Sequence, residues 1–176
     1  TDLAMNSEDR VLTAAEVIAG VRGRDALLCN ITDPVTAEIL AAAPGLRVVA
    51  NFGVGFNNID VAAATARKIP VTNTPGVLTE ATADIAFALL LAAARRLGEG
   101  ERLVRSKAWS GWNPMQMLGA DVTGATLGLV GFGRIGKAMA KRARAFDLEV
   151  IYWNRTRLAA EEAAAASGVS LTLAAG

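Results

Sequence analysis

The sequence feature that most constrains the fold is a glycine motif at residues 131–136, which read G-F-G-R-I-G. A short apolar run from Thr126 to Val130 precedes the motif, and a helical pattern follows it as far as Phe146. A strand, a G-x-G-x-x-G turn and a helix in this order are typical of the first unit of a dinucleotide-binding domain.

Each glycine of the motif has its own expected role. Gly131 permits a tight turn, Gly133 lets the backbone approach a pyrophosphate, and Gly136 lets the helix pack close to the strand. The helix N-terminus offers free N–H groups and the positive end of its dipole to the phosphates. The sequence therefore predicts a cofactor site here, and the alternative is a glycine-rich turn that binds no ligand.

The loop after the next strand discriminates between the two nicotinamide cofactors. NAD sites place Asp or Glu there, about 20 residues beyond the glycines, to bind the ribose 2′-OH. Here the loop begins Asn154-Arg155-Thr156 and holds no carboxylate. Arg155 would attract a 2′-phosphate, and Asn154 and Thr156 can donate hydrogen bonds to it. We therefore expect NADP, with NAD as an alternative. Arg157 could replace Arg155, and a solvated basic loop is the structural alternative.

The rest of the chain alternates short apolar runs with helical stretches, which predicts an α/β fold with mainly parallel sheets. A capping box, Thr13 with Glu16, marks the first helix. The helix from Thr79 is expected to be buried nearly all round, with Gly98 and Gly100 loosening its end. Besides the elements around the glycine motif, we expect helices at Thr13–Val21, Thr36–Ala43, Val61–Arg67, Thr79–Leu97 and Leu158–Ser167, and strands at Ala26–Cys29, Arg47–Asn51, Ile69–Thr72, Leu148–Trp153 and Val169–Leu173.

Composition argues against several classes of partner. The net charge of +1 gives no field that would attract nucleic acid or an anionic membrane. The longest apolar run, Ile85 to Ala94, is shorter than the about 20 residues of a membrane span. A single cysteine, Cys29, excludes an internal disulfide and fits a cytoplasmic protein. The sequence contains no histidine, the usual proton-transfer group near neutral pH, and we expect no metal site.

Two further motifs resemble those of a known family. Residues 51–60, N-F-G-V-G-F-N-N-I-D, and residues 72–84, T-N-T-P-G-V-L-T-E-A-T-A-D, resemble the substrate-domain motifs of the D-2-hydroxyacid dehydrogenases. The similarity extends from about Asp9 to Arg157 and is nearest to the glyoxylate/hydroxypyruvate reductase branch.

The resemblance implies roles for particular residues. The backbone amides of Val54 and Gly55 would bind the carboxylate of a 2-oxo acid, because consecutive N–H groups in a glycine turn can form an anion site. Thr82 would approach the nicotinamide end of the cofactor, and Arg134 and Ile135 would lie along the pyrophosphate.

The resemblance also implies a domain organisation. We expect part of a flavodoxin-like substrate domain over residues 1–98, a connecting arm over 99–123, and an incomplete Rossmann cofactor domain over 124–176. Family members dimerise through the cofactor domain and the arm, so we expect a homodimer; packing within one subunit is the alternative. The apolar arm residues available for either contact are Trp109, Trp112, Met115 and Met117.

The sequence departs from the family in its chemistry. The family's catalytic Arg, Glu and His come later in the chain than any residue here, so we assign no catalytic residue. We expect this chain to be an inactive piece of a longer enzyme, which would reduce glyoxylate, hydroxypyruvate or a similar small 2-oxo acid with NADPH. The alternatives are a dinucleotide-binding module without catalysis, and a family member acting on phosphoglycerate, phosphite or a sugar acid.

Overall fold

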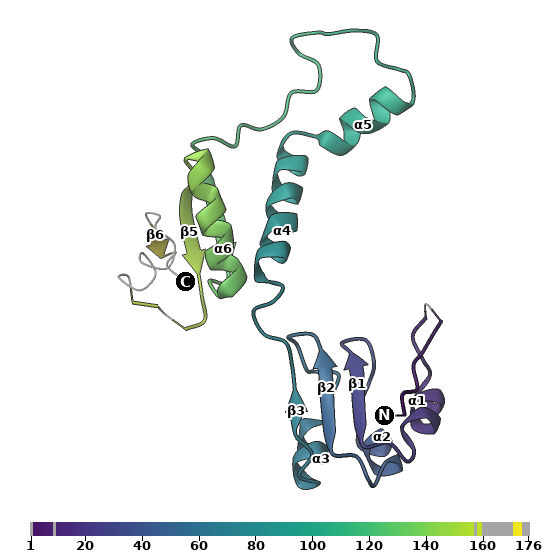
Figure 1. Ribbon diagram of the computed structural model, residues 1–176. Coiled ribbons are helices and arrows are strands. Elements are labelled where there is room, and N and C mark those ends of the chain that lie inside the picture. Colours follow the sequence, from purple (N-terminus) through teal and green to yellow (C-terminus); the bar gives the residue numbers. More distant parts are fainter. Residues whose placement is uncertain (1, 9, 157, 160–170, 174–176) are drawn as a thin grey trace. The chain divides into compact units, whose positions relative to one another are not determined.

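Two α/β units make up the chain, Thr1–Val77 and Leu78–Gly176, and each contains a three-stranded parallel sheet. The computed structural model describes residues 2–8, 10–156, 158–159 and 171–173 (Figure 1). The predicted α/β class with parallel sheets is confirmed.

The first unit has the strand order β1-β2-β3, with a helix in each connection between strands (Figure 1). A helical crossover is the usual way to join neighbouring parallel strands, because the chain must return to the same end of the sheet. The elements in chain order are α1 (Ala14–Val21), β1 (Ala26–Asn30), α2 (Ala37–Ala42), β2 (Val48–Phe52), α3 (Val61–Ala66) and β3 (Val71–Thr72).

One face of this sheet carries the core. Leu27 pairs with Val49 and Cys29 with Asn51, so these four side chains lie on the same face. Leu28, one position out of phase, is 74% exposed. The helices and the segments that join them to the strands add the remaining buried residues, which are Val17, Val21, Val35, Ile39, Leu40, Ala43, Leu46, Ile59, Ala64 and Ile69.

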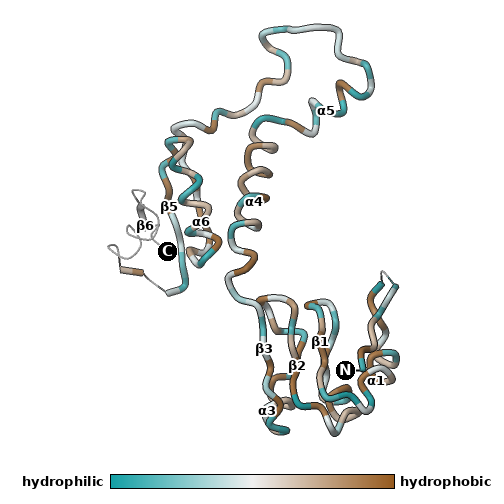
Figure 2. The backbone as a smooth tube through the Cα atoms, viewed as in Figure 1, coloured by the Kyte–Doolittle hydropathy of each residue, from teal (hydrophilic) through white to brown (hydrophobic). Residues whose placement is uncertain are grey.

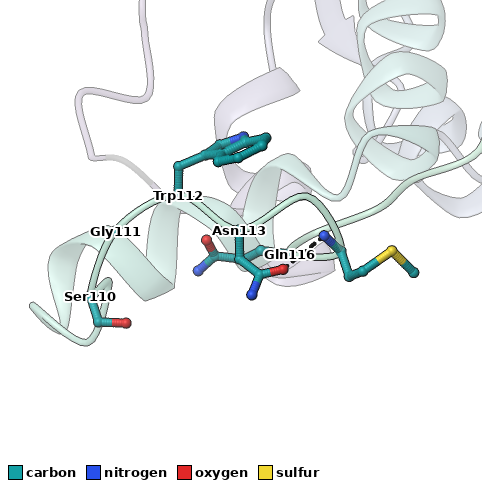
Figure 3. Close-up of a pocket in the computed structure, with 6 residues that line it drawn as sticks. Ser110, Gly111, Trp112, Asn113 and Gln116 are labelled. Carbon is teal, nitrogen blue, oxygen red and sulfur yellow. Dashed lines mark hydrogen bonds between the residues drawn. The ribbon is translucent and has the colours of Figure 1, made fainter.

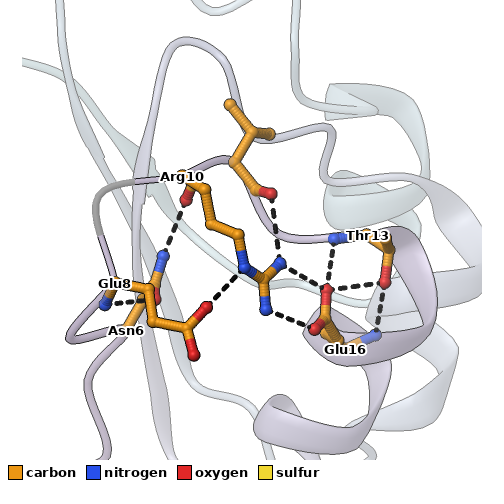
Figure 4. Close-up of polar contacts among 6 residues, drawn as sticks. Asn6, Glu8, Arg10, Thr13 and Glu16 are labelled. Atoms are coloured by element: carbon orange, nitrogen blue, oxygen red, sulfur yellow. Dashed lines mark hydrogen bonds and ion pairs between the residues drawn. The ribbon is translucent and has the colours of Figure 1, made fainter.

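The predicted capping box at the start of α1 is confirmed (Figure 4). The Thr13 hydroxyl accepts a hydrogen bond from the Glu16 amide at 3.3 Å, and the Thr13 amide donates to the Glu16 carboxylate at 2.8 Å. Arg10 makes an ion pair with the same carboxylate at 2.6 Å. The Arg10 guanidinium and then the Thr13 amide lower the pKa of Glu16 to about 2.

The second unit has the strand order β4-β5-β6. Its core lies between the sheet and the helices α4 and α6 and is formed by Ala83, Phe87, Phe132, Ala138, Met139, Ala140, Ala143, Leu148, Val150 and Tyr152. The elements in chain order are α4 (Thr79–Ala94), α5 (Leu97–Arg105), β4 (Thr126–Val130), α6 (Arg134–Ala143), the 3-10 helix η1 (Arg144–Phe146), β5 (Glu149–Trp153) and β6 (Leu171–Leu173).

Helix α4 packs against α6, and this contact assigns α4 to the second unit. Phe87 meets Phe146 with ring centroids 5.1 Å apart, and Arg142 donates to the Asp84 carboxylate at 2.8 Å and the Glu80 carboxylate at 3.0 Å. By packing, the first unit therefore ends at Val77, whereas the sequence grouped residues up to 98 with the first domain. The functional division into substrate and cofactor domains stays a prediction.

The predicted long helix differs from the structure in its end and its burial. It stops at Ala94, because Arg96 adopts a left-handed conformation with φ 54°, and α5 then begins at Leu97. Gly98 and Gly100 lie inside α5 rather than breaking a helix, so that expectation is wrong.

Every residue of α4 from Ile85 to Ala94 is apolar, whereas the first part of the helix is mixed (Figure 2). Even so, Ile85 and Leu89 are 64% and 63% exposed, and Ala83 and Phe87 are the residues of this helix that are buried. The expectation of burial nearly all round is therefore wrong for this chain, because α6 covers α4 from one side.

In the described part of the chain, no helix is long and apolar enough to cross a membrane.

The predicted arm, residues 99–123, begins inside α5, which extends to Arg105. Residues 106–125 form neither helix nor strand. Trp112 is 82% exposed and lies at an open hollow of about 460 Å³, together with Asn113 and Gln116 (Figure 3).

The predicted helix Leu158–Ser167 lies mostly outside the described residues, whereas β6 confirms the last part of the strand predicted at Val169–Leu173.

The charge network at α1 predicts an acid-dependent stability. The pKa of Glu16 is lowered in the folded chain. The Glu16 carboxylate therefore contributes fully to folding stability above pH 4.5, its ordinary pKa, and this contribution disappears as pH falls toward about 2. Urea unfolding between pH 5 and pH 2, followed by circular dichroism, should show a smaller loss of stability in Glu16→Gln than in the unmodified chain. If the free energy of unfolding fell equally steeply with pH in the two proteins, the assignment of this acid dependence to Glu16 would be contradicted.

Candidate functional site

The predicted glycine turn joins β4 to α6 in the second unit. Gly131 has φ 100°, a conformation that L side chains rarely adopt, and its amide donates to the Trp153 carbonyl at 2.8 Å. This bond links the turn to the end of β5. The turn therefore lies at the carboxyl end of the sheet, where ligands of open α/β folds bind.

Gly136 provides the close approach that the sequence predicted. A Cβ at this position would lie 2.4 Å from the Gly131 carbonyl oxygen, too close for any side chain. The first turn of α6 therefore packs directly on the backbone after β4. Phe132 lies beneath this contact, 1% exposed, with its ring centroid 4.6 Å from that of Tyr152.

Gly133 differs from the other two glycines of the motif. A Cβ there would meet nothing within 4 Å in the described part of the chain, and its φ of −80° suits any residue. Neither packing nor conformation within the chain requires glycine at this position. The neighbouring Arg134 and Ile135, which begin α6, are exposed.

Asn154 connects the glycine turn to the loop after β5. Its side-chain oxygen accepts from the Phe132 amide at 3.5 Å, and its Nδ2 donates to the Thr156 carbonyl at 2.7 Å. Arg155 and Thr156 are exposed beside it. One amide hydrogen of Asn154 thus serves the loop itself, which the sequence did not predict.

The first unit places Val54 and Gly55 in the loop after β2. Val54 is 42% exposed, and a Cβ at Gly55 would meet nothing within 4 Å. Among the described residues, neither the Val54 amide nor the Gly55 amide donates a hydrogen bond. A Cβ at Gly53 would lie 2.2 Å from the Ile31 Cγ2 atom, so the loop after β1 packs closely against the start of this turn.

Three asparagines support this loop, and the sequence analysis gave them no role. The Nδ2 group of Asn51 donates to the Gly55 carbonyl at 2.7 Å, and that of Asn73 donates to the Val54 carbonyl at 2.9 Å. Asn58 donates to the Asn51 side-chain oxygen at 3.3 Å. The available signal was the position of Asn51 and Asn73 at the ends of neighbouring parallel strands, next to the glycines.

Cys29 lies behind the loop and is buried. Its thiol is 3.6 Å from the Asn51 side-chain oxygen. Burial, and then the charge of Asp33, raise the pKa of the Cys29 thiol. The thiol is therefore a neutral hydrogen-bond donor to Asn51 rather than a nucleophile.

Thr82 is exposed on the first turn of α4, one residue before the buried Ala83. Arg142 joins α4 to α6 nearby, and its hydrogen bond to Asp84 is the main cause of its raised pKa. The described residues hold no group of three His, Cys, Asp or Glu side chains that could bind a metal ion.

Comparison with known proteins agrees with these observations. Residues 3–175 match the family model described as D-isomer specific 2-hydroxyacid dehydrogenase, catalytic domain. The chain belongs to this family. Among curated relatives, the glyoxylate reductase of Korarchaeum cryptofilum is 56% identical over 142 residues, which are 80% of this chain and 43% of that protein.

Solved structures show the same relationship. TT0316 protein from Thermus thermophilus matches with a TM-score of 0.83 and 45% identity, over 94% of this chain and 55% of that one. D-lactate dehydrogenase from Aquifex aeolicus, solved with NAD and lactic acid, matches with a TM-score of 0.75 and 25% identity, over 89% of this chain and 45% of that one. The chain thus spans about half the length of these relatives.

The glycine motif predicts opposite outcomes for two alanine substitutions. Gly136→Ala should lower the free energy of unfolding by about 1–3 kcal/mol, because the new methyl group overlaps the Gly131 carbonyl. Gly133→Ala should change it by less than about 0.5 kcal/mol, because the space is open. Chemical denaturation of the two variants measures the difference.

The same two substitutions distinguish a glycine that packing requires from a glycine that a bound phosphate requires. If a dinucleotide phosphate approaches the turn, Gly133→Ala should weaken NADPH binding more than tenfold while the chain remains folded. Fluorescence titration with NADPH measures this. A Gly133→Ala variant that binds NADPH as tightly as the unmodified chain would show that the space beside Gly133 receives no phosphate.

Proposed function

We propose that this chain supplies the cofactor turn and the carboxylate-binding loop of an NADPH-dependent reductase for glyoxylate, hydroxypyruvate or a similar small 2-oxo acid. The observation that carries the proposal is the start of α6, where the space beside Gly133 is open and nothing in the chain requires glycine. Gly20 and Gly45 are equally open, so the position of Gly133 at a helix N-terminus gives the observation its weight.

The fold that this proposal requires is a flavodoxin-like substrate-domain part followed by the first part of a Rossmann domain. The strand order β4-β5-β6, with the glycine turn after the first strand, fits the beginning of a doubly wound sheet. In such a domain the pyrophosphate lies at the α6 N-terminus, with the amides of Arg134 and Ile135 as donors. Thr82 would lie toward the nicotinamide, which supplies the hydride when the cofactor is bound.

NADP is the cofactor that the loop after β5 favours. Arg155 and Thr156 are exposed there, and residues 154–156 include no carboxylate that would repel a 2′-phosphate. Asn154 has one amide hydrogen beyond the one it gives to Thr156. We therefore assign the 2′-phosphate to Arg155, with Asn154 and Thr156 beside it.

The substrate class rests on the loop after β2 and on the relatives. Carbonyls of this loop accept hydrogen bonds from Asn51 and Asn73, and the Val54 and Gly55 amides remain available for a carboxylate. Several curated relatives that are 49–56% identical to this chain bear the name glyoxylate reductase, which supports glyoxylate as the first substrate to test.

The proposed assembly is a homodimer formed through the arm. Trp109, Trp112 and Met115 are exposed by 54%, 82% and 73%, an unusual density of large apolar side chains for a surface segment. Sedimentation of the complete gene product would test this proposal, and a monomer at micromolar concentration would contradict it.

The activity is tested on the complete gene product. With glyoxylate or hydroxypyruvate, it should oxidise NADPH with a higher kcat/KM than NADH, measured by the absorbance of the reduced nicotinamide. Equal or reversed cofactor preference would contradict the NADP assignment. Binding of NADPH without turnover would instead support a dinucleotide-binding module.

Arg155 allows a sharper test of cofactor choice on this chain alone. Arg155→Ala should raise the Kd for NADPH about tenfold, because a charge-assisted hydrogen bond to the 2′-phosphate is lost, and leave the Kd for NADH within about twofold. Arg144→Ala, an exposed arginine beyond the other end of α6, is the matched control. A parallel loss for both cofactors in Arg155→Ala would contradict a role in selecting the phosphate.

A further inference from the structure

The loop after β2 is held by its carbonyl groups. Asn73 donates to the Val54 carbonyl at 2.9 Å, and Asn51 donates to the Gly55 carbonyl at 2.7 Å. Asn73 follows the end of β3, and Asn51 belongs to β2. The two donors therefore come from neighbouring parallel strands and hold two consecutive peptide groups of one turn.

Holding a carbonyl also sets the direction of an amide. In a trans peptide the C=O of one residue and the N–H of the next point in opposite directions within a rigid plane. The bond from Asn73 to the Val54 carbonyl therefore directs the Gly55 amide away from Asn73. The bond from Asn51 to the Gly55 carbonyl fixes the next plane, which carries the Phe56 amide. Asn51 also donates to the Gly53 carbonyl at 3.5 Å, and the plane of that carbonyl carries the Val54 amide.

Asn51 is itself firmly held. It is 2% exposed, and it is the buried polar side chain of the described core. Its oxygen accepts from Asn58 at 3.3 Å and lies 3.6 Å from the Cys29 thiol, while its nitrogen serves the Gly55 carbonyl. With both ends of the amide engaged, the side chain cannot rotate without losing a buried hydrogen bond.

We infer that Asn51 and Asn73 are positioning residues that aim the backbone amides of the Val54–Gly55 turn at a substrate carboxylate. The inference rests on the proposed function, because it takes the carboxylate of a 2-oxo acid as the ligand of these amides. Neither asparagine touches the substrate; each acts by fixing the peptide plane that does.

The two asparagines differ in burial, and this difference makes the inference testable. Loss of the buried Asn51 leaves the Gly55 carbonyl without its donor and destabilises the first unit, whereas the Asn58 side chain keeps its bonds to the Asn30 and Asp33 carbonyls. Asn73 is exposed, so Asn73→Ala removes a single donor and leaves the core unchanged. Asn57 lies in the same loop, is exposed, and makes no side-chain hydrogen bond to any described residue, which makes Asn57→Ala the matched control.

The experiment follows the backbone amide resonances of Val54 and Gly55 in the ¹⁵N-labelled chain while glyoxylate is added at constant ionic strength. Glyoxylamide, which lacks the carboxylate, is the uncharged control ligand. The unmodified chain and Asn57→Ala should show the same saturable shifts. Asn73→Ala should weaken glyoxylate binding about fivefold to tenfold with an unchanged thermal unfolding midpoint, and Asn73→Gln, which keeps an amide donor, should recover part of the affinity.

The outcomes separate this inference from the proposed function. If glyoxylate shifts the Val54 and Gly55 resonances equally in the unmodified chain, Asn73→Ala and Asn51→Ala, the positioning role is wrong and the carboxylate site stands. If glyoxylate shifts neither resonance in the unmodified chain, the carboxylate site is wrong and the positioning role fails with it.

Discussion

The second unit depends on the contact between α6 and the backbone after β4. Only glycine at position 136 allows the first turn of the helix to pack against the Gly131 carbonyl oxygen, because any Cβ would lie 2.4 Å from it. This contact brings the helix N-terminus to the carboxyl end of the sheet. The burial of Phe132 against Tyr152, the bond from Gly131 to Trp153 and the bridge through Asn154 all lie around it.

The first unit presents backbone amides by a different physical device. No helix begins within the Gly53–Gly55 turn, so no helix dipole or free first-turn amides are available there. Instead, side-chain donors take up the carbonyls of Val54 and Gly55, and the amides of these two residues donate no hydrogen bond among the described residues. Each unit thus leaves N–H groups exposed at the carboxyl end of a parallel strand, one through a helix terminus and the other through asparagine amides.

Particular residues show how far the sequence could predict these features. The capping box of Thr13 and Glu16, the strands around the glycine motif and the close approach at Gly136 follow from local patterns, and the structure confirms them. The end of α4 did not follow, because the left-handed conformation of Arg96 is not encoded by a residue type that favours it. The burial of α4 was also overestimated, because hydropathy shows which side chains can be buried and not which surfaces meet them (Figure 2).

The sequence by itself determined the α/β class and the place of the glycine turn, and it predicts a preference for a 2′-phosphate, because glycine spacing and local charge act over a few residues. Only the tertiary structure decided that α4 packs with the second unit, through the pairing of Arg142 with Asp84 and Glu80. It likewise decided that Asn51 and Asn73 hold the loop after β2. The contacts of Arg142 with α4 and of Asn73 with Val54 join residues that are 19 to 62 positions apart, which meet only when helices pack or neighbouring strands align. The bond from Asn51 to Gly55 is local, but the burial that holds Asn51 in place comes from the core of the sheet.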